Sequence, residues 1–230
     1  MSAAAAVPNE PPNPWFSWAF IRDNQELLLT ALREHVSITL VAMVAAIVLA
    51  FPLALLSRRY RRLEGPVLAL AGVLYTIPAL VAIAILWPIF GLSPLTVEIA
   101  LAVYALLILL RNFIAGLDGV PSDVMEAARG MGFSNRRLLW RVQIPLAVPT
   151  MLAGVRIATV STIGLVTIGA LVGHGGFGSL IIRGFEDNLY RAEILTATLA
   201  CVLLAVLAEV TLLGVERLAT PWARRRRAAA

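Results

Sequence analysis

Five apolar runs separated by polar segments limit the possible folds of this chain more than any other feature. They cover residues 36–56, 67–90, 96–110, 147–172 and 192–213. A helix needs about 20 consecutive apolar residues to cross the ~30 Å hydrocarbon core of a bilayer. The sequence therefore predicts an all-α polytopic membrane protein with about five transmembrane helices. The run at 96–110 meets the criterion least well, because it is short and has Glu98 near its start.

The composition agrees with this class and argues against several functions. Hydrophobic residues make up 60% of the chain and charged residues 14%, whereas about a quarter of a soluble domain is charged. The net charge of +5 comes from arginines at the ends of apolar runs, so we expect no nucleic-acid partner. Cys201 cannot form an internal disulfide, and His174 has no partner at metal-ligand spacing. No nucleotide-binding loop or nucleophile–base pair is present, so we expect no enzyme activity and no cofactor.

The arginines also predict an orientation. The cluster Arg58–Arg62 follows the first run, and positively charged loops lie in the cytoplasm. This places the N-terminus outside and the C-terminus in the cytoplasm, together with the loop at 121–145. The Arg224–Arg227 run lies on the same inner side, where it fixes orientation or contacts anionic membrane lipid.

Three regions follow from this pattern. Residues 1–34 form an N-terminal tail and, from Trp15 onward, a helix lying on the membrane surface, because tryptophans there precede a polar segment. Residues 35–216 form the transmembrane domain, and residues 217–230 form a basic cytoplasmic tail. The first 14 residues have no basic segment followed by an apolar one, so we do not interpret them as a signal peptide.

The polar loop at 121–145 has the signals of two short helices. Asp123 and Glu126 have the spacing of a capping box at the start of the first helix. Gly132 is expected to end it, Ser134 to cap the second, and Pro145 to stop the second. The prediction is an elbow of two helices at the membrane surface.

Polar and small residues inside the runs are candidates for a translocation path or gate. Pro78 bends the second span, either as a structural kink or to present Tyr75 and Thr76 to a path. Arg156 either extends toward the cytoplasm or pairs with Glu209. In the fourth span, small residues allow close helix contact and threonines form a neighbouring face. These are Gly154, Ala158 and Thr162 on the first face, and Thr159 and Thr167 on the second.

A glycine-rich segment between the fourth and fifth spans predicts a mobile or re-entrant loop on the outer side. We expect Ser179 to cap a short helix after it. The loop is a candidate for an external gate and for a surface on which a binding protein docks. Its residues are Gly173, Gly175, Gly176, Phe177 and Gly178.

The loop at 121–145 resembles the "EAA" loop of ABC importer permeases. The shared features are Glu126-Ala127-Ala128, Gly132 four residues later, and Val142-x-Ile144-Pro145, where the family prefers isoleucine and leucine at the two apolar positions. The resemblance implies a type I-like permease core in a bacterial inner membrane. It also implies that the loop couples the permease to an ATPase subunit that binds ATP and magnesium. The coupling residues would be Glu126, Ala127, Ala128, Gly132, Ser134 and Pro145.

Further segments between Glu34 and Gly184 resemble the osmoprotectant branch of this family. They include Thr76–Leu80 and Gly154–Val160. The resemblance implies a cargo such as glycine betaine, choline, carnitine or proline betaine, an external solute-binding protein, and a second permease subunit, identical or paralogous. The alternatives are an importer for methionine or another amino acid and, from a different class, a channel or scaffold protein without an ATPase.

Cysteine labelling tests the predicted orientation. In a Cys201→Ala background, Ser134→Cys is expected to react with a membrane-impermeant maleimide only after the membrane is opened. Asn188→Cys is expected to react in intact spheroplasts. Labelling of the Ser134 position from outside would contradict the cytoplasmic placement of the loop.

Overall fold

The computed structural model describes residues 13–221, and within them the regular structure is helical. Residues 1–12 and 222–230, including the Arg224–Arg227 tail, lie outside the described residues. The long helices are α2 (Gln25–Arg59), α3 (Arg61–Thr76), α4 (Ala79–Phe90), α5 (Pro94–Asp118), α8 (Ile144–Val166) and α10 (Arg191–Ala219). The short ones are α1 (Trp18–Asp23), α6 (Ser122–Gly130), α7 (Asn135–Leu138) and α9 (Phe177–Glu186). A π turn (Leu139–Gln143) and a 3-10 turn (Thr167–Val172) flank α8.

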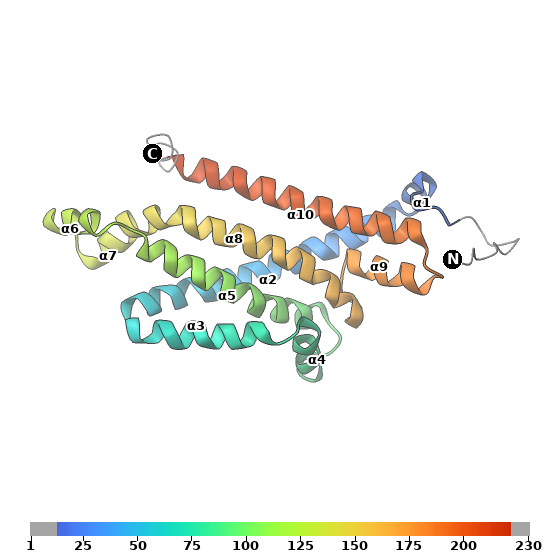
Figure 1. Cartoon of the computed structure of the whole chain (residues 1–230), viewed down its shortest axis with the longest axis horizontal. Coiled ribbons are helices and arrows are strands. Elements are labelled where there is room, and N and C mark those ends of the chain that lie inside the picture. The colour runs from blue at the N-terminus through green and yellow to red at the C-terminus, as the bar shows by residue number, and fades with distance from the viewer. Residues whose placement is uncertain (1–12, 222–230) are drawn as a thin grey trace, which may run out of the picture.

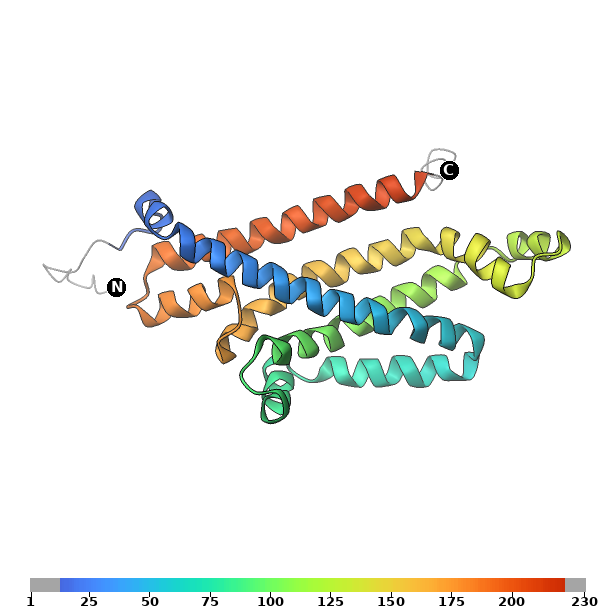
Figure 2. The ribbon, with the colours of Figure 1, turned by 180° about the vertical axis from the view of Figure 1, so that it is seen from behind.

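The helices form an elongated bundle in which α5 is central. α2, α3, α4 and α8 all pack against α5, and Figures 1 and 2 show α2, α3 and α8 running beside it along the bundle, whereas α4 turns across the bundle at the end of α3. Side chains of α5 such as Leu101, Leu109 and Leu117 are fully buried. α6 and α7 lie at one end of the long axis and α1 and α9 at the other, so the described ends of the chain lie far apart (Figure 1).

The structure confirms the class and the approximate number of spans. Among residues 13–221, four helical stretches are long and apolar enough to cross a membrane, and α3 with α4 makes a fifth if the bent pair counts as one. The segment that we considered weakest, at 96–110, belongs to α5, which extends over 25 residues and is the most buried of these stretches. The apolar run ends at Arg111, but the helix continues because that side chain is exposed while Phe113, Ile114 and Leu117 remain in the core.

The second span is broken rather than bent. α3 and α4 meet at an angle of 94°. Ile77 has extended backbone angles and Pro78 stands at the N-cap of α4. A residue that precedes proline avoids the helical region, because the proline ring would clash with it. The expected kink is therefore a complete interruption at Ile77–Pro78.

The surface helix predicted over residues 15–34 is only partly present. Trp18–Asp23 forms the short α1, whose Phe20 N–H is accepted by the Ser17 hydroxyl at 3.1 Å. From Gln25 onward the chain is already part of α2, which continues through the first span. Its 35 residues give a length of about 52 Å, so α2 is longer than a ~30 Å hydrocarbon core.

Small residues allow α8 to approach α5 and α2. Gly154 packs on Asn112 of α5, where an added Cβ would lie 2.3 Å from the Asn112 Cβ. Ala158 is fully buried, and the Thr162 hydroxyl lies 3.6 Å from the Met43 sulfur of α2. The face predicted from Gly154, Ala158 and Thr162 is therefore a helix–helix contact.

Gly154→Ala is expected to destabilise the bundle, because the added methyl group forces α8 away from α5. Overpacking of this kind costs about 1–3 kcal/mol. Gly164→Ala in the same helix is the matched control, since no heavy atom lies within 4 Å of its added Cβ. Unfolding of the detergent-solubilised protein measures both. Equal stability of the two variants would contradict the close contact.

Candidate functional site

The elbow, defined as residues 121–145, has the two-helix form predicted for it. It lies at the end of the bundle where α5 and α8 terminate (Figure 1). α6 ends at Gly130, and Gly132 has a φ of +80°, a backbone angle that residues other than glycine rarely adopt. The Phe133 N–H donates to the Ala128 carbonyl at 3.2 Å. The Ser134 hydroxyl accepts from the Arg137 N–H at 3.4 Å and caps α7.

Two details of the predicted elbow were wrong. Asp123 is not the cap, because α6 begins at Ser122 after Pro121; Asp123 lies in the first turn, where its charge still favours the helix N-terminus. Pro145 does not stop the second helix but lies in the first turn of α8. Proline is tolerated in the first turn of a helix, because the N–H that it lacks would have no helical partner there. The π turn leads into this first turn, and the Ile144 N–H donates to the Leu139 carbonyl, five residues back.

The elbow has a buried apolar side and an exposed polar side. Its core consists of Val120, Met125, Ala128 and Leu138, with Phe133, Val142 and Leu146 packed around them. On the other side Glu126, Ala127 and Arg129 are exposed, and Met131 is 70% exposed. Thus the glutamate and the first alanine of the Glu-Ala-Ala triplet face outward, while the second alanine anchors α6.

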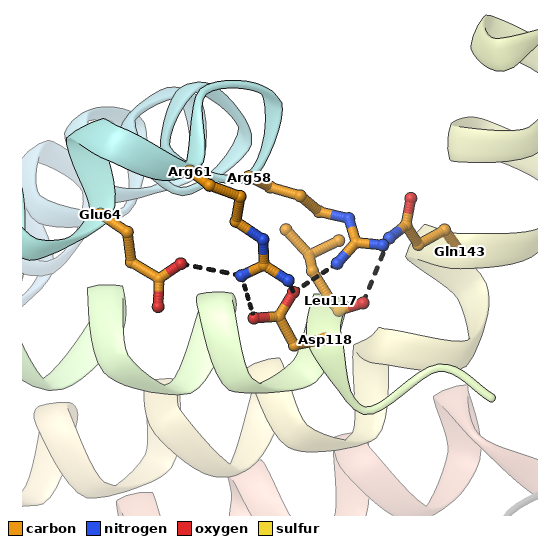
Figure 3. A network of polar contacts seen from close by, with 6 residues as sticks. All are labelled: Arg58, Arg61, Glu64, Leu117, Asp118 and Gln143. Carbon is orange, nitrogen blue, oxygen red and sulfur yellow. Dashed lines mark hydrogen bonds and ion pairs between the residues drawn. The ribbon is translucent and has the colours of Figure 1, made fainter. Parts of the chain in front are cut away.

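A polar network holds the base of the elbow (Figure 3). The Asp118 carboxylate, at the end of α5, accepts hydrogen bonds from Arg58 at the end of α2 and from Arg61 of α3, the latter at 2.7 Å. Arg61 also contacts Glu64 at 2.8 Å. The buried Gln143 amide donates to the Leu117 carbonyl at 3.1 Å. These bonds link the ends of α2, α3, α5 and the π turn where the elbow begins and ends. The sequence analysis missed Asp118 and Gln143.

The side chains predicted for a translocation path do not meet within this subunit. Tyr75 contacts Tyr104 of α5, with ring centroids 5.5 Å apart, while the neighbouring Thr76 hydroxyl donates to the Val73 carbonyl and Pro78 is exposed. Thr159 and Thr167 donate to carbonyls of their own helical segment. α5 packs against both the broken span and α8, and the 3-10 turn that carries Thr167 also contacts α4, so the two groups are distributed around α5 rather than gathered in one cluster.

Arg156 does pair with Glu209, one of the two possibilities that the sequence left open. Its Nε lies 3.2 Å from the Glu209 carboxylate of α10. A second carboxylate, Glu216, lies 3.4 Å from the same guanidinium. Glu216 was missed, although it follows Glu209 by seven residues, which places both on one helix face.

The glycine-rich loop is closely packed. An added Cβ at Gly176, whose φ is +54°, would lie 2.6 Å from the His35 Cβ of α2, and one at Gly178 would lie 2.3 Å from the Thr167 carbonyl. Close approach of the backbone therefore accounts for Gly176 and Gly178, whereas Gly173 is exposed and has a φ of +86°. The predicted short helix is present as α9, but its N-cap is Gly176; Ser179 instead accepts the Gly175 N–H at 3.3 Å.

Two α2 residues hold this loop, and the sequence did not predict their roles. The Glu34 carboxylate accepts the Gly176 N–H at 3.2 Å and contacts the His174 ring at 3.2 Å. The buried His35 ring accepts the Phe177 N–H through Nδ1 at 3.3 Å, and its Nε2 donates to the Ile163 carbonyl at 2.9 Å. His35 therefore joins α2, α8 and α9 at the end opposite the elbow.

Comparison with known proteins gives a consistent assignment. Residues 37–225 match the family described as binding-protein-dependent transport system inner membrane component. The glycine betaine/carnitine/choline transport system permease protein OpuCD of Bacillus subtilis is 34% identical, over 88% of this chain and 88% of its own length. The carnitine transport permease protein OpuCB of Listeria monocytogenes is 35% identical, over 90% of this chain and 94% of its own. The osmoprotectant import permease protein OsmW of Salmonella typhimurium is 34% identical, over 82% and 90%.

The fold matches a solved transporter. A chain of the MetNI methionine ABC transporter, in an inward facing conformation, superposes with a TM-score of 0.78. The match covers 86% of this chain and 98% of the other, with 21% sequence identity. At this identity the likeness establishes the fold.

Asp118→Asn is expected to loosen the base of the elbow, because it removes the charge that Arg58 and Arg61 share. The side chains are partly exposed, so the expected loss of stability is about 1 kcal/mol, with faster proteolysis within residues 121–145. Glu64→Gln is the control, since Glu64 contacts Arg61 alone in this network. Unfolding midpoints and limited proteolysis measure both. A larger effect of Glu64→Gln would contradict the central position of Asp118.

Proposed function

The chain belongs to the family of binding-protein-dependent transport system inner membrane components and is a permease of an ABC importer. We propose that its cargo is an osmoprotectant such as glycine betaine, choline or carnitine. The observation that carries the cargo proposal is the near full-length similarity, at 31–35% identity, to permeases named for these compounds. The MetNI likeness concerns the fold and adds no support for methionine.

The elbow is the surface on which an ATPase subunit docks in this proposal. Its exposed face provides charged and apolar groups, and its buried face packs α6 and α7 against the π turn and the start of α8. The coupling residues are Glu126, Ala127, Ala128, Gly132, Ser134 and Pro145, as the family resemblance implies. The partner ATPase, not this chain, binds ATP and magnesium.

Coupling follows from how the elbow is attached. The chain enters it from α5 and leaves it into α8, and the Asp118–Arg58–Arg61 network also links it to α2 and α3. When the ATPase subunits close, a displaced elbow moves these helices together. A rigid connection transmits such a displacement, whereas a flexible loop would absorb it. Repeated closure and opening would alternate access between the two sides of the membrane.

Two further partners belong to the proposal. A solute-binding protein delivers the cargo at the opposite end of the bundle, where the Gly173–Gly178 loop and α9 lie. A second permease subunit completes the path, because the four or five spans that the structure describes in one subunit are few to enclose it. Exposed apolar side chains along α10, such as Leu203 and Leu207, suit contact with lipid.

Uptake measurements test the proposed cargo. Cells that lack other osmoprotectant uptake systems, and that express this permease with its partner ATPase and solute-binding protein, are expected to accumulate radiolabelled glycine betaine, choline or carnitine at high salt. Accumulation is expected to require ATP hydrolysis. Uptake of methionine without uptake of these three compounds would contradict the osmoprotectant proposal and identify methionine as the cargo.

Gly132→Leu is expected to uncouple transport while the protein still inserts in the membrane. A leucine at a φ of +80° costs about 1–2 kcal/mol and drives the turn between α6 and α7 into another conformation. Gly130→Leu is the control, because Gly130 is helical and, like Gly132, has no heavy atom within 4 Å of an added Cβ. Uptake is expected to fall at least tenfold in the first variant only. Normal uptake by Gly132→Leu would contradict this function of the elbow.

A further inference from the structure

The break in the second span places an aromatic pair inside the membrane domain. Tyr75 lies in the last turn of α3, and its ring meets that of Tyr104 of α5 at a centroid distance of 5.5 Å and an interplanar angle of 54°. Tyr75 is 42% exposed, whereas Tyr104 is 7% exposed. One ring therefore faces out of the subunit and the other supports it from within.

The depth of this pair follows from the helices that carry it. Tyr75 comes 14 residues after Arg61, and Tyr104 comes 14 residues before Asp118, to which Arg61 is bound. At ~1.5 Å per residue, both rings lie about 21 Å from the ionic network. That distance is more than halfway across a ~30 Å hydrocarbon core.

The Tyr104 hydroxyl is not explained by the packing of the subunit. It is buried, and it has no hydrogen-bond partner among residues 13–221. Buried polar atoms are paired in the great majority of cases, because an unpaired one is costly. Phenylalanine would fill the same space without that cost. A hydroxyl that the fold does not use is therefore available to a ligand when movement at the adjacent α3–α4 break uncovers it.

The interrupted backbone supplies complementary charge next to the rings. The C-terminal end of α3 presents carbonyl groups, which attract a cation, and Pro78 has no N–H with which to close the last turn. The N-terminal end of α4 presents N–H groups, which attract an anion. A break in a membrane helix thus offers both signs of partial charge within a few residues. A zwitterion matches this arrangement.

We propose that Tyr75, Tyr104 and the Ile77–Pro78 break form a transient binding site, within the membrane, for a small quaternary ammonium compound that carries an oxygen. The exposed Tyr75 ring attracts the ammonium group by a cation–π interaction. The Tyr104 hydroxyl donates a hydrogen bond to the hydroxyl or carboxylate oxygen of the ligand. The ligand class rests on the proposed function; the location of the site rests on the geometry of these residues.

Binding to membrane vesicles that contain the permease with its ATPase, without the solute-binding protein, tests the site. The probes are radiolabelled glycine betaine, choline and tetramethylammonium, the last of which has no oxygen. Tyr75→Leu is expected to weaken binding of all three by about tenfold or more, whereas Tyr75→Phe retains the ring and stays close to wild type. Tyr104→Phe is expected to weaken glycine betaine and choline by about tenfold while leaving tetramethylammonium unchanged.

Trp87→Leu is the matched control, because Trp87 is another exposed aromatic residue of the broken span and is not expected to change binding. Wild-type affinity in Tyr75→Leu, or equal weakening of all three probes in Tyr104→Phe, would overturn the site while leaving the proposed cargo intact. If cells with the wild-type permease take up no quaternary ammonium compound and the vesicles bind none, both the proposed cargo and the proposed ligand class are wrong.

Discussion

The contact of α5 with its neighbours is the interaction on which the rest of the structure depends. In hydrocarbon, helices gain little from the hydrophobic effect when they associate, so close packing holds them together. Gly154 lets α8 approach Asn112 of α5, and large apolar residues of α5 fill the centre of the bundle. α2, α3 and α4 pack on other sides of the same helix. A displacement of α5 therefore reaches every span except α10, which packs mainly on α8 and α9.

Polar interactions are concentrated where this bundle ends. At the elbow end, Asp118 and Gln143 join four segments. At the other end, Glu34 and His35 hold the glycine turn, and the Arg183 guanidinium contacts the buried Glu193 at 2.6 Å. These contacts lie at or near helix ends and turns. Backbone groups there have no partner within a helix, and side chains or charges from other segments take that place. The two ends are thus held by polar contacts, whereas the interruption at Ile77–Pro78 has exposed aromatic residues before and after it, Tyr75 in α3 and Trp87 in α4.

Sequence reasoning succeeded where a signal is local. Long apolar runs predicted the spans, and Gly132 and Ser134 predicted the ends of α6 and α7, because a positive φ and a capping hydroxyl depend on a few adjacent residues. It failed where the conformation depends on contacts with other segments of the chain, often distant in the sequence. The burial of Gly175–Gly178 depends on packing against α2 and the 3-10 turn, and the inclusion of Pro145 in a helix depends on the π turn before it. The path residues were chosen for polarity, which does not reveal the helix that each one faces.

The sequence by itself determined the class of the protein, its family and the position of the elbow, since hydrophobic runs and turn residues act through the backbone nearby. Only the tertiary structure decided which polar groups meet. Asp118 and Arg61 are 57 residues apart, and Glu34 and Gly176 are 142 apart. No local pattern connects such residues, because their contact is set by how the helices pack. The pairing of Tyr75 with Tyr104 has the same origin: two helices that cross the membrane in opposite directions, in contact along their length, bring the two rings to one depth.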